Sequence, residues 1–155
     1  MTLHLLAVGK LKSAWARDAC GLYQQRIKRY APFDITEIRD AVSEGAPERA
    51  SEVEGARIVG QLSSRDWPVA LDVTGTMYAS EKLAAWLDRR LADGVFRTVF
   101  IIGGPFGLSP PALARCRERL SLSALTLPHE LCRVVFLEQL YRAFTIIRGE
   151  QYHHG

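Results

Sequence analysis

Five short strand-like runs, four of them apolar and one (residues 33–38) alternating apolar with polar residues, are separated by longer segments of helical character. This pattern constrains the fold more than any other feature. The runs cover residues 2–8, 33–38, 67–73, 97–102 and 121–127. Each has the length of a strand, and each gap is long enough for a helical crossover. This β-α-β order predicts an α/β fold, with a mostly parallel five-stranded sheet and helices on both faces. We expect residues 1–155 to form a single domain.

Two of the expected helices have clear ends. Ser13 is expected to cap a helix that ends near Ala31. Ser80 is expected to cap an amphipathic helix that stops at Asp93-Gly94.

Two other segments are less regular. Residues 40–63 begin as a polar stretch that contains Pro47 and two glycines, which predicts a flexible loop first and a helix only afterwards. Residues 110–120 form a basic segment in which we expect a short helix.

The last helix is expected over residues 129–147, opened by Pro128. It is apolar on nearly every face, and its few charges include Glu138 and Arg142 at the i, i+4 spacing of an ion pair. The simplest explanation is that one face packs on the sheet and the other on a second subunit, which predicts a homodimer. The alternative is complete burial within one chain.

Composition narrows the class of protein. The net charge of +3 permits a nucleic-acid partner without requiring one. The three cysteines are far apart and never form C-x-x-C, so we expect reduced thiols and no metal site. No segment has the roughly 18 apolar residues of a membrane span, and the first apolar run is too short for a signal peptide. We therefore expect a cytoplasmic protein with no membrane partner.

A glycine cluster, residues 103–107, follows the fourth run and precedes a helix. Glycines there permit positive φ angles and close approach of the backbone to a ligand at a strand end. The spacing is not G-x-G-x-x-G, and residues 121–127 contain no acid to hold a ribose, which argues against an NAD-dependent enzyme of Rossmann type. A purely structural tight turn remains the alternative.

The run at residues 121–127 places Ser123 and Thr126 among leucines. Apolar walls with polar backbone edges suit a flat heteroaromatic ring. The alternative is an ordinary buried strand.

Basic residues alternate with aromatic ones near the end of the first helix. Arg26, Lys28 and Arg29 lie between Tyr23 and Tyr30, a pattern that suits RNA phosphates and unstacked bases. On this pattern alone, a solvated helix face with the tyrosines packed inward is favoured.

Several motifs together resemble one known family. They are L-L-A-V-G-K at the start, L-D-V-T-G at 71–75, I-G-G-P-F-G-L-S at 102–109, L-S-L-S-A-L-T-L-P-H at 120–129, E-Q-L-Y-R-A at 138–143 and Q-Y-H near the end. Together they resemble the RlmH family, small SPOUT-superfamily enzymes that methylate N3 of a pseudouridine in 23S ribosomal RNA. The resemblance covers essentially the whole chain.

The resemblance implies a SPOUT-type fold with a deep C-terminal trefoil knot, a homodimer, and S-adenosylmethionine bound in the knot. The substrate would be 23S rRNA within the large subunit or the assembled ribosome. Residues implied to bind the cofactor are Leu71, Gly103, Leu122, Ser123, Ala124, Leu125, Thr126 and Leu127. Gly104, Pro105 and Gly107 would shape the middle loop. A non-catalytic ribosome- or RNA-binding module of the same fold is the alternative.

Methylation of a uracil-type N3 requires loss of its proton, so a general base is expected. His153 is the first candidate, with Tyr152 orienting the substrate. His129 is the second candidate for the base, or it packs against the cofactor loop.

Arg133 is expected to balance the deprotonated ring or an RNA phosphate. His154, followed by Gly155, stands where family members usually have a basic residue, and it would grip RNA only partly at neutral pH.

Overall fold

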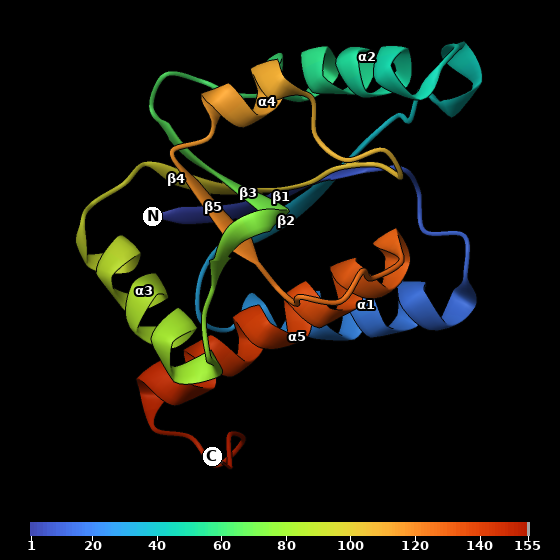
Figure 1. Cartoon of the computed structure of the whole chain (residues 1–155). Coiled ribbons are helices and arrows are strands. Elements are labelled where there is room, and N and C mark those ends of the chain that lie inside the picture. Colours follow the sequence, from blue (N-terminus) through green and yellow to red (C-terminus); the bar gives the residue numbers. More distant parts are fainter. Residues whose placement is uncertain (155) are drawn as a thin grey trace.

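The computed structural model describes residues 1–154, in which a parallel five-stranded sheet lies between two layers of helices (Figure 1). The strands run in the order β2-β1-β4-β3-β5 across the sheet, and each neighbouring pair is parallel. They are β1 (Thr2–Val8), β2 (Phe33–Ile38), β3 (Asp66–Met77), β4 (Arg97–Ile102) and β5 (Glu118–Ser121). The predicted α/β fold with five parallel strands is confirmed.

Helices cover both faces of the sheet, as predicted. One face carries α1 (Ala14–Ile27), α3 (Ser80–Ala92) and α5 (His129–Arg148), and the other carries α2 (Pro47–Val59), α4 (Pro110–Arg115) and the 3-10 turn η1 (Val42–Glu44) (Figure 1). Successive strand residues point to opposite faces, so Leu5 and Phe100 enter the larger core while Leu6 and Ile101 enter the smaller one. The central strands β1 and β4 are thus buried from both sides.

The prediction that residues 40–63 begin as a loop is wrong from Pro47 onward. Proline is tolerated at the first position of a helix, where its missing N–H has no partner to lose. Gly55 inside α2 is a packing requirement, because a Cβ there would lie 2.0 Å from Ser109 Oγ. The glycine that argued against a helix instead brings α2 close to the start of α4.

Ser13 is the N-cap residue of α1, as predicted, but its side chain makes no capping hydrogen bond, and the helix ends at Ile27, before the predicted Ala31. The predicted cap at Ser80 is wrong, because Ala79 is the N-cap and Ser80 is the first residue of α3. Ser13 Oγ donates to Glu130 Oε2 at 2.7 Å, and Ser80 Oγ donates to Gln139 Oε1 at 2.7 Å. Both hydroxyls therefore tie their helices to α5. The predicted stop at Asp93-Gly94 is confirmed, with Gly94 at φ +65°.

The prediction of a fifth strand over residues 121–127 is wrong. The strand is Glu118–Ser121, taken from the end of the segment expected to be helical, and residues 122–127 form a loop. β5 pairs only with β3 at the edge of the sheet, and the exposed Arg119 keeps its charge in solvent there. The leucines of residues 122–127, whose pattern predicted a buried strand, lie in the loop after β5.

β3 is longer than predicted and is interrupted by a bulge. Its register with β5 shifts between Leu71 and Thr76, so residues 72–75 leave the ladder before pairing resumes. Gly75 is needed here, because a Cβ would lie 2.6 Å from the backbone of Arg119 and Leu120. The expected turn at Thr74-Gly75 is this bulge.

Part of the apolar character of α5 is explained within one chain. The side chains of Phe136, Leu137, Leu140 and Phe144 are buried in the larger core, while Leu131 stays 36% exposed. The homodimer and the trefoil knot remain predictions. Among residues 1–154, no helix is long and apolar enough to cross a membrane.

Candidate functional site

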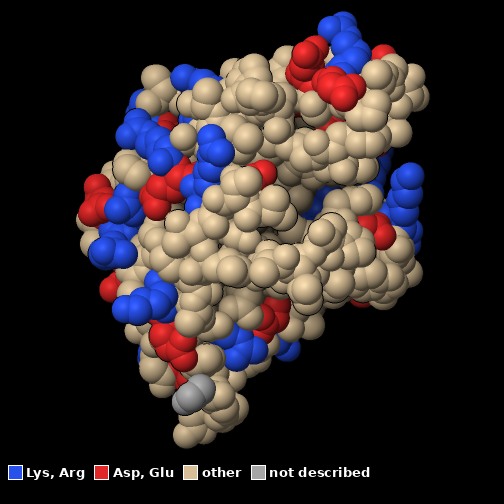
Figure 2. Space-filling model, viewed as in Figure 1, with Lys and Arg blue, Asp and Glu red and all other residues tan. Residues whose placement is uncertain are grey.

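The bulge of β3 and the carboxyl ends of β4 and β5 meet at a cavity of about 540 Å³. Its wall is built from residues 71–73, 102–105, 107, 121–123 and 125–129, together with Cys132 from α5. In Figure 2 the hollow on the face shown is bordered mainly by uncharged side chains. A ligand site at the carboxyl ends of parallel strands is the arrangement expected for such a sheet.

Seven of the eight residues implied to bind the cofactor line this cavity. They are Leu71, Gly103, Leu122, Ser123, Leu125, Thr126 and Leu127. Ala124 is exposed and does not line it. His129 also lines the cavity, at the first turn of α5.

The glycine loop has the close contacts that its sequence suggested. A Cβ on Gly103 would lie 3.0 Å from the Gly107 carbonyl carbon, and Gly107 adopts φ +75°. The Gly107 N–H donates to the Gly104 carbonyl at 3.0 Å, which closes a tight turn. The turn is therefore a structural necessity and also part of the cavity wall.

Hydroxyl side chains hold the loop after β5 in shape. Ser121 Oγ donates to the Ser123 carbonyl at 3.1 Å, and the Leu125 N–H donates to Ser123 Oγ at 2.9 Å. Across the cavity, the Thr74 N–H donates to Asp72 Oδ1 at 2.9 Å. Both walls are therefore fixed by bonds within their own segments.

Sequence reasoning missed several residues of the wall. Val73, Ile102, Ser121, Pro128 and Cys132 line the cavity without having been assigned to it. The i, i+3 spacing of Cys132 from His129 was the available signal, since it places both on one face of a helix. Burial raises the pKa of the Cys132 thiol, so this wall is uncharged there.

The start of α5 is anchored to the loop after β1. Glu130 accepts hydrogen bonds from the Lys12 N–H, from the Ser13 N–H at 3.1 Å and from Ser13 Oγ at 2.7 Å. These bonds, that of the Ser13 hydroxyl above all, lower the pKa of Glu130 to about 2. The anchor fixes the end of α5 that carries His129.

Arg133 does not occupy the RNA-contacting position expected for it. Its side chain is 2% exposed, with Nη1 2.7 Å from Glu37 Oε1 and Nη2 donating to the Gly9 carbonyl at 2.7 Å. A guanidinium buried in this way ties α5 to the ends of β1 and β2. This burial argues against the predicted contact of Arg133 with an RNA phosphate.

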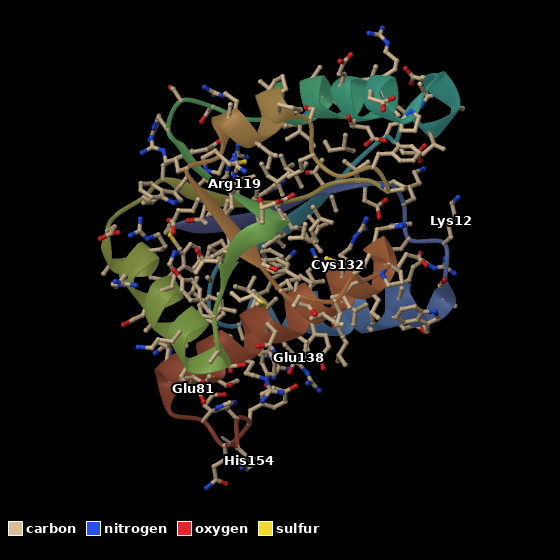
Figure 3. All side chains as sticks on the ribbon, viewed as in Figure 1. Lys12, Glu81, Arg119, Cys132, Glu138 and His154 are labelled. Carbon is tan, nitrogen blue, oxygen red and sulfur yellow. The ribbon has the colours of Figure 1, made fainter. Side chains whose placement is uncertain are left out.

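His153 and Tyr152 lie at the opposite end of α5 from the cavity and do not line it. His153 Nε2 is 2.8 Å from Glu81 Oε1, and its Nδ1 is 3.3 Å from Arg142 Nη1. Figure 3 shows Glu81 and His154 together near the chain terminus, away from Cys132. One chain alone does not bring His153 to its own cavity.

Tyr152 belongs to a small polar cluster at this end of the molecule. Its hydroxyl donates to Glu138 Oε1 at 3.1 Å, and the Arg142 guanidinium lies 4.8 Å from the centre of its ring. Arg142 also pairs with Glu138 at 2.5 Å, as its spacing predicted. Burial and hydrogen bonding raise the pKa of Tyr152, so it remains a neutral phenol suited to orienting a substrate.

The basic end of α1 is partly engaged within the chain. Lys28 Nζ is 3.2 Å from Asp34 Oδ1, and the Arg26 guanidinium lies 5.4 Å from the centre of the Tyr141 ring. Tyr30 stacks on Phe144 at 5.2 Å, so the tyrosines pack inward as the alternative proposed. Arg29 is exposed, and an RNA contact by this segment remains a prediction.

Comparisons with known proteins agree with this geometry. A family model described as "Predicted SPOUT methyltransferase" matches residues 1–153. Proteins named ribosomal RNA large subunit methyltransferase H are similar over 99% of this chain and 99% of their own length. Identity is 40% over 161 residues for those of Clostridium acetobutylicum and Bacillus pumilus, and 39% over 158 residues for that of Listeria monocytogenes.

Among solved structures, a probable methylase family protein from Haemophilus influenzae has a similar fold. The TM-score is 0.53 at 11% identity, over 99% of this chain and 70% of the other. At that identity, the likeness concerns the fold alone.

Proposed function

Since the chain belongs to the SPOUT methyltransferase family, we propose that it methylates N3 of a pseudouridine in 23S ribosomal RNA, with S-adenosylmethionine as the methyl donor. One observation carries the proposal: seven residues from three separated segments, singled out by resemblance, line a single cavity. The relatives named as large-subunit rRNA methyltransferases support the choice of substrate. Work on ribosomal RNA would place the protein in the cytoplasm.

The cavity suits S-adenosylmethionine in size and in chemistry. Its volume of about 540 Å³ lies within the range of ligand pockets, and its wall combines four leucines with glycines and hydroxyl residues. Gly103 and Gly104 are required by the protein itself, since a Cβ on either would crowd Gly107 or Glu54 Oε2. When bound, the cofactor supplies a methyl group already activated on a sulfonium, so the protein's main task is positioning.

A homodimer is supported by the apolar rim of the cavity. Val73 is 73% exposed and Leu125 75%, and Phe106, between the lining residues Pro105 and Gly107 in sequence, is 44% exposed. Large apolar side chains gathered around one opening mark an interaction surface. We propose that a second copy of the chain covers this rim.

The proposed dimer also gives His153 access to a cavity. The 20 residues of α5, about 30 Å of helix, separate His153 from the cavity of its own chain, so the cavity it serves is that of the partner. There it would accept the N3 proton, with Tyr152 orienting the base. His129, already in the wall, is the second candidate.

On the RNA side, we propose that Arg26, Lys28, Arg29 and His154 contact the substrate. Of these, Lys28 has an exposed ion pair with Asp34, which exchanges readily for a phosphate. Arg29 and His154 are exposed.

The test is transfer of tritiated methyl groups to ribosomal RNA. Ribosomes and separated subunits from a strain lacking the endogenous enzyme are offered to wild type, His153→Ala and His129→Ala. We expect transfer by wild type and a fall of about 10²–10⁴-fold for the variant that lacks the base. Binding of ribosomes with no affinity for S-adenosylmethionine would instead identify a non-catalytic module.

A further inference from the structure

Glu54 is a buried carboxylate that neither the fold nor the proposed reaction accounts for. It lies on α2 and is 1% exposed. Its Oε1 accepts a hydrogen bond from the Ala41 N–H at 2.9 Å. Its Oε2 is buried and, among residues 1–154, has no hydrogen-bond partner.

The unpartnered oxygen lies directly behind the glycine loop. A Cβ added to Gly104 would be 2.7 Å from Glu54 Oε2, so the oxygen contacts this glycine from the α2 side. Gly104 is also part of the cavity wall. Only the backbone of Gly104 therefore separates the carboxylate from the cavity at this point.

The cations near Glu54 in the sequence are engaged elsewhere. Arg57, one turn further along α2, pairs with Glu44 at 2.7 Å and donates to the carbonyls of Arg39 and Asp40. Arg49, earlier on the same helix, lies 3.9 Å from Glu52 on the exposed side. A buried carboxylate without a cation is costly, and a positive charge on a nearby ligand reduces that cost.

We propose that Glu54 is a positioning residue which, acting through the thin glycine loop, makes the cavity prefer a sulfonium cation to a neutral thioether. This inference rests on the proposed function. Methyl transfer breaks the S–CH₃ bond, forms the N3–CH₃ bond and leaves the electron pair on sulfur, so the sulfur loses its positive charge. The carboxylate then attracts S-adenosylmethionine but not the sulfur of S-adenosylhomocysteine, which favours release of the product.

The test is calorimetric titration of the full chain with each of these two ligands. Glu54→Gln keeps the shape of the side chain and an oxygen for the Ala41 N–H, removes the charge, and places an amide NH2 group where Oε2 lies. We expect it to weaken S-adenosylmethionine binding by about tenfold, while S-adenosylhomocysteine binding changes less than about twofold. Glu52→Gln, an exposed glutamate two residues away on α2, is the matched control and should change neither affinity.

Equal weakening of both ligands, or an unchanged ratio of their dissociation constants, overturns the assignment and leaves Glu54 a packing residue. If circular dichroism shows that Glu54→Gln does not fold, Glu54→Asp and Glu54→Asn repeat the comparison. Those two side chains have the same length and differ in charge, and the aspartate should retain the preference. Failure of wild type to bind either ligand would count against the proposed function instead.

Discussion

Gly75 is the residue at which the bulge of β3 touches the backbone of β5. A Cβ there would lie 2.6 Å from backbone atoms, which cannot move aside as a side-chain end does. We therefore expect Gly75→Ala to lower the free energy of unfolding by about 1–3 kcal/mol, measured by urea denaturation.

The control is Gly21→Ala on α1, where a Cβ meets nothing within 4 Å. Alanine is favoured over glycine inside a helix, so this variant should gain about 0.5–1 kcal/mol. Equal effects of the two substitutions would contradict the crowding assigned to Gly75.

Arg133 was predicted to contact RNA, but its side chain links α5 to Glu37 and to the Gly9 carbonyl. Arg133→Met removes both its ion pair and its bond to the Gly9 carbonyl. We expect the free energy of unfolding to fall by about 2–4 kcal/mol, less than for a fully buried pair because Glu37 is 35% exposed.

The salt dependence of ribosome binding should stay unchanged in Arg133→Met, because no phosphate contact is lost. Arg29→Met provides the comparison, with little change in stability and a shallower salt slope. The opposite pattern would restore Arg133 as an RNA contact.

Between elements, the bond of Glu130 to the loop after β1 makes stability depend on pH. Its pKa in the folded chain is about 2, against 4.5 for the free side chain. A lowered pKa means that this contribution is complete above pH 4.5 and is lost as the pH falls towards 2.

Glu130→Gln should therefore be less stable than wild type at neutral pH, and the difference should shrink between pH 4.5 and 2. Urea midpoints measured across that range are the readout. Glu52→Gln, on the exposed side of α2, should follow wild type throughout. A constant difference for Glu130→Gln would show that its carboxylate charge is not what anchors α5.

The accuracy of the sequence predictions differs from element to element for physical reasons. β1, β2 and β4 were predicted to the residue, since β1 and β4 are apolar runs with clear ends and β2 alternates apolar with polar residues. The last strand was misplaced because residues 122–127 have the composition of a buried strand, yet their leucines line a cavity instead of a core. Burial in a ligand site and burial in a sheet leave the same apolar pattern in a sequence.

For the molecule as a whole, the proposed exchange of active-site parts between two chains has a direct test. Gly103→Val crowds the cavity of its own chain but keeps His153, and His153→Ala keeps the cavity. Each variant alone should be inactive in methyl transfer. Mixed after unfolding and refolding together, they should recover roughly a quarter of wild-type activity, since half of the dimers are mixed and each has one complete site.

If each variant alone is inactive, no recovery would mean that His153 acts on the cavity of its own chain. Two variants of the same residue, Gly103→Val and Gly103→Leu, form the control mixture and should stay inactive.

The relative positions of distant residues were the hardest feature to predict from the sequence. The positions of Gly103 and Leu127 at a shared edge followed from the parallel sheet, since parallel strands end on one side. The place of His153 did not, because its distance from the cavity depends on the direction in which α5 runs back across the sheet. The sequence alone therefore does not indicate whether His153 acts on the cavity of its own chain or on that of the partner.

The separation of His153 from the cavity along α5 has a consequence for when such a protein works. In the proposed arrangement, a single newly translated chain has the methyl-donor site at one end of α5 and the proton acceptor at the other. It is inactive until it pairs with a second chain. While copies are scarce, turnover should rise with the square of their concentration and become linear once pairing is complete. Methyl transfer in a cell would then become appreciable only above a certain concentration of the protein, without a separate inhibitor.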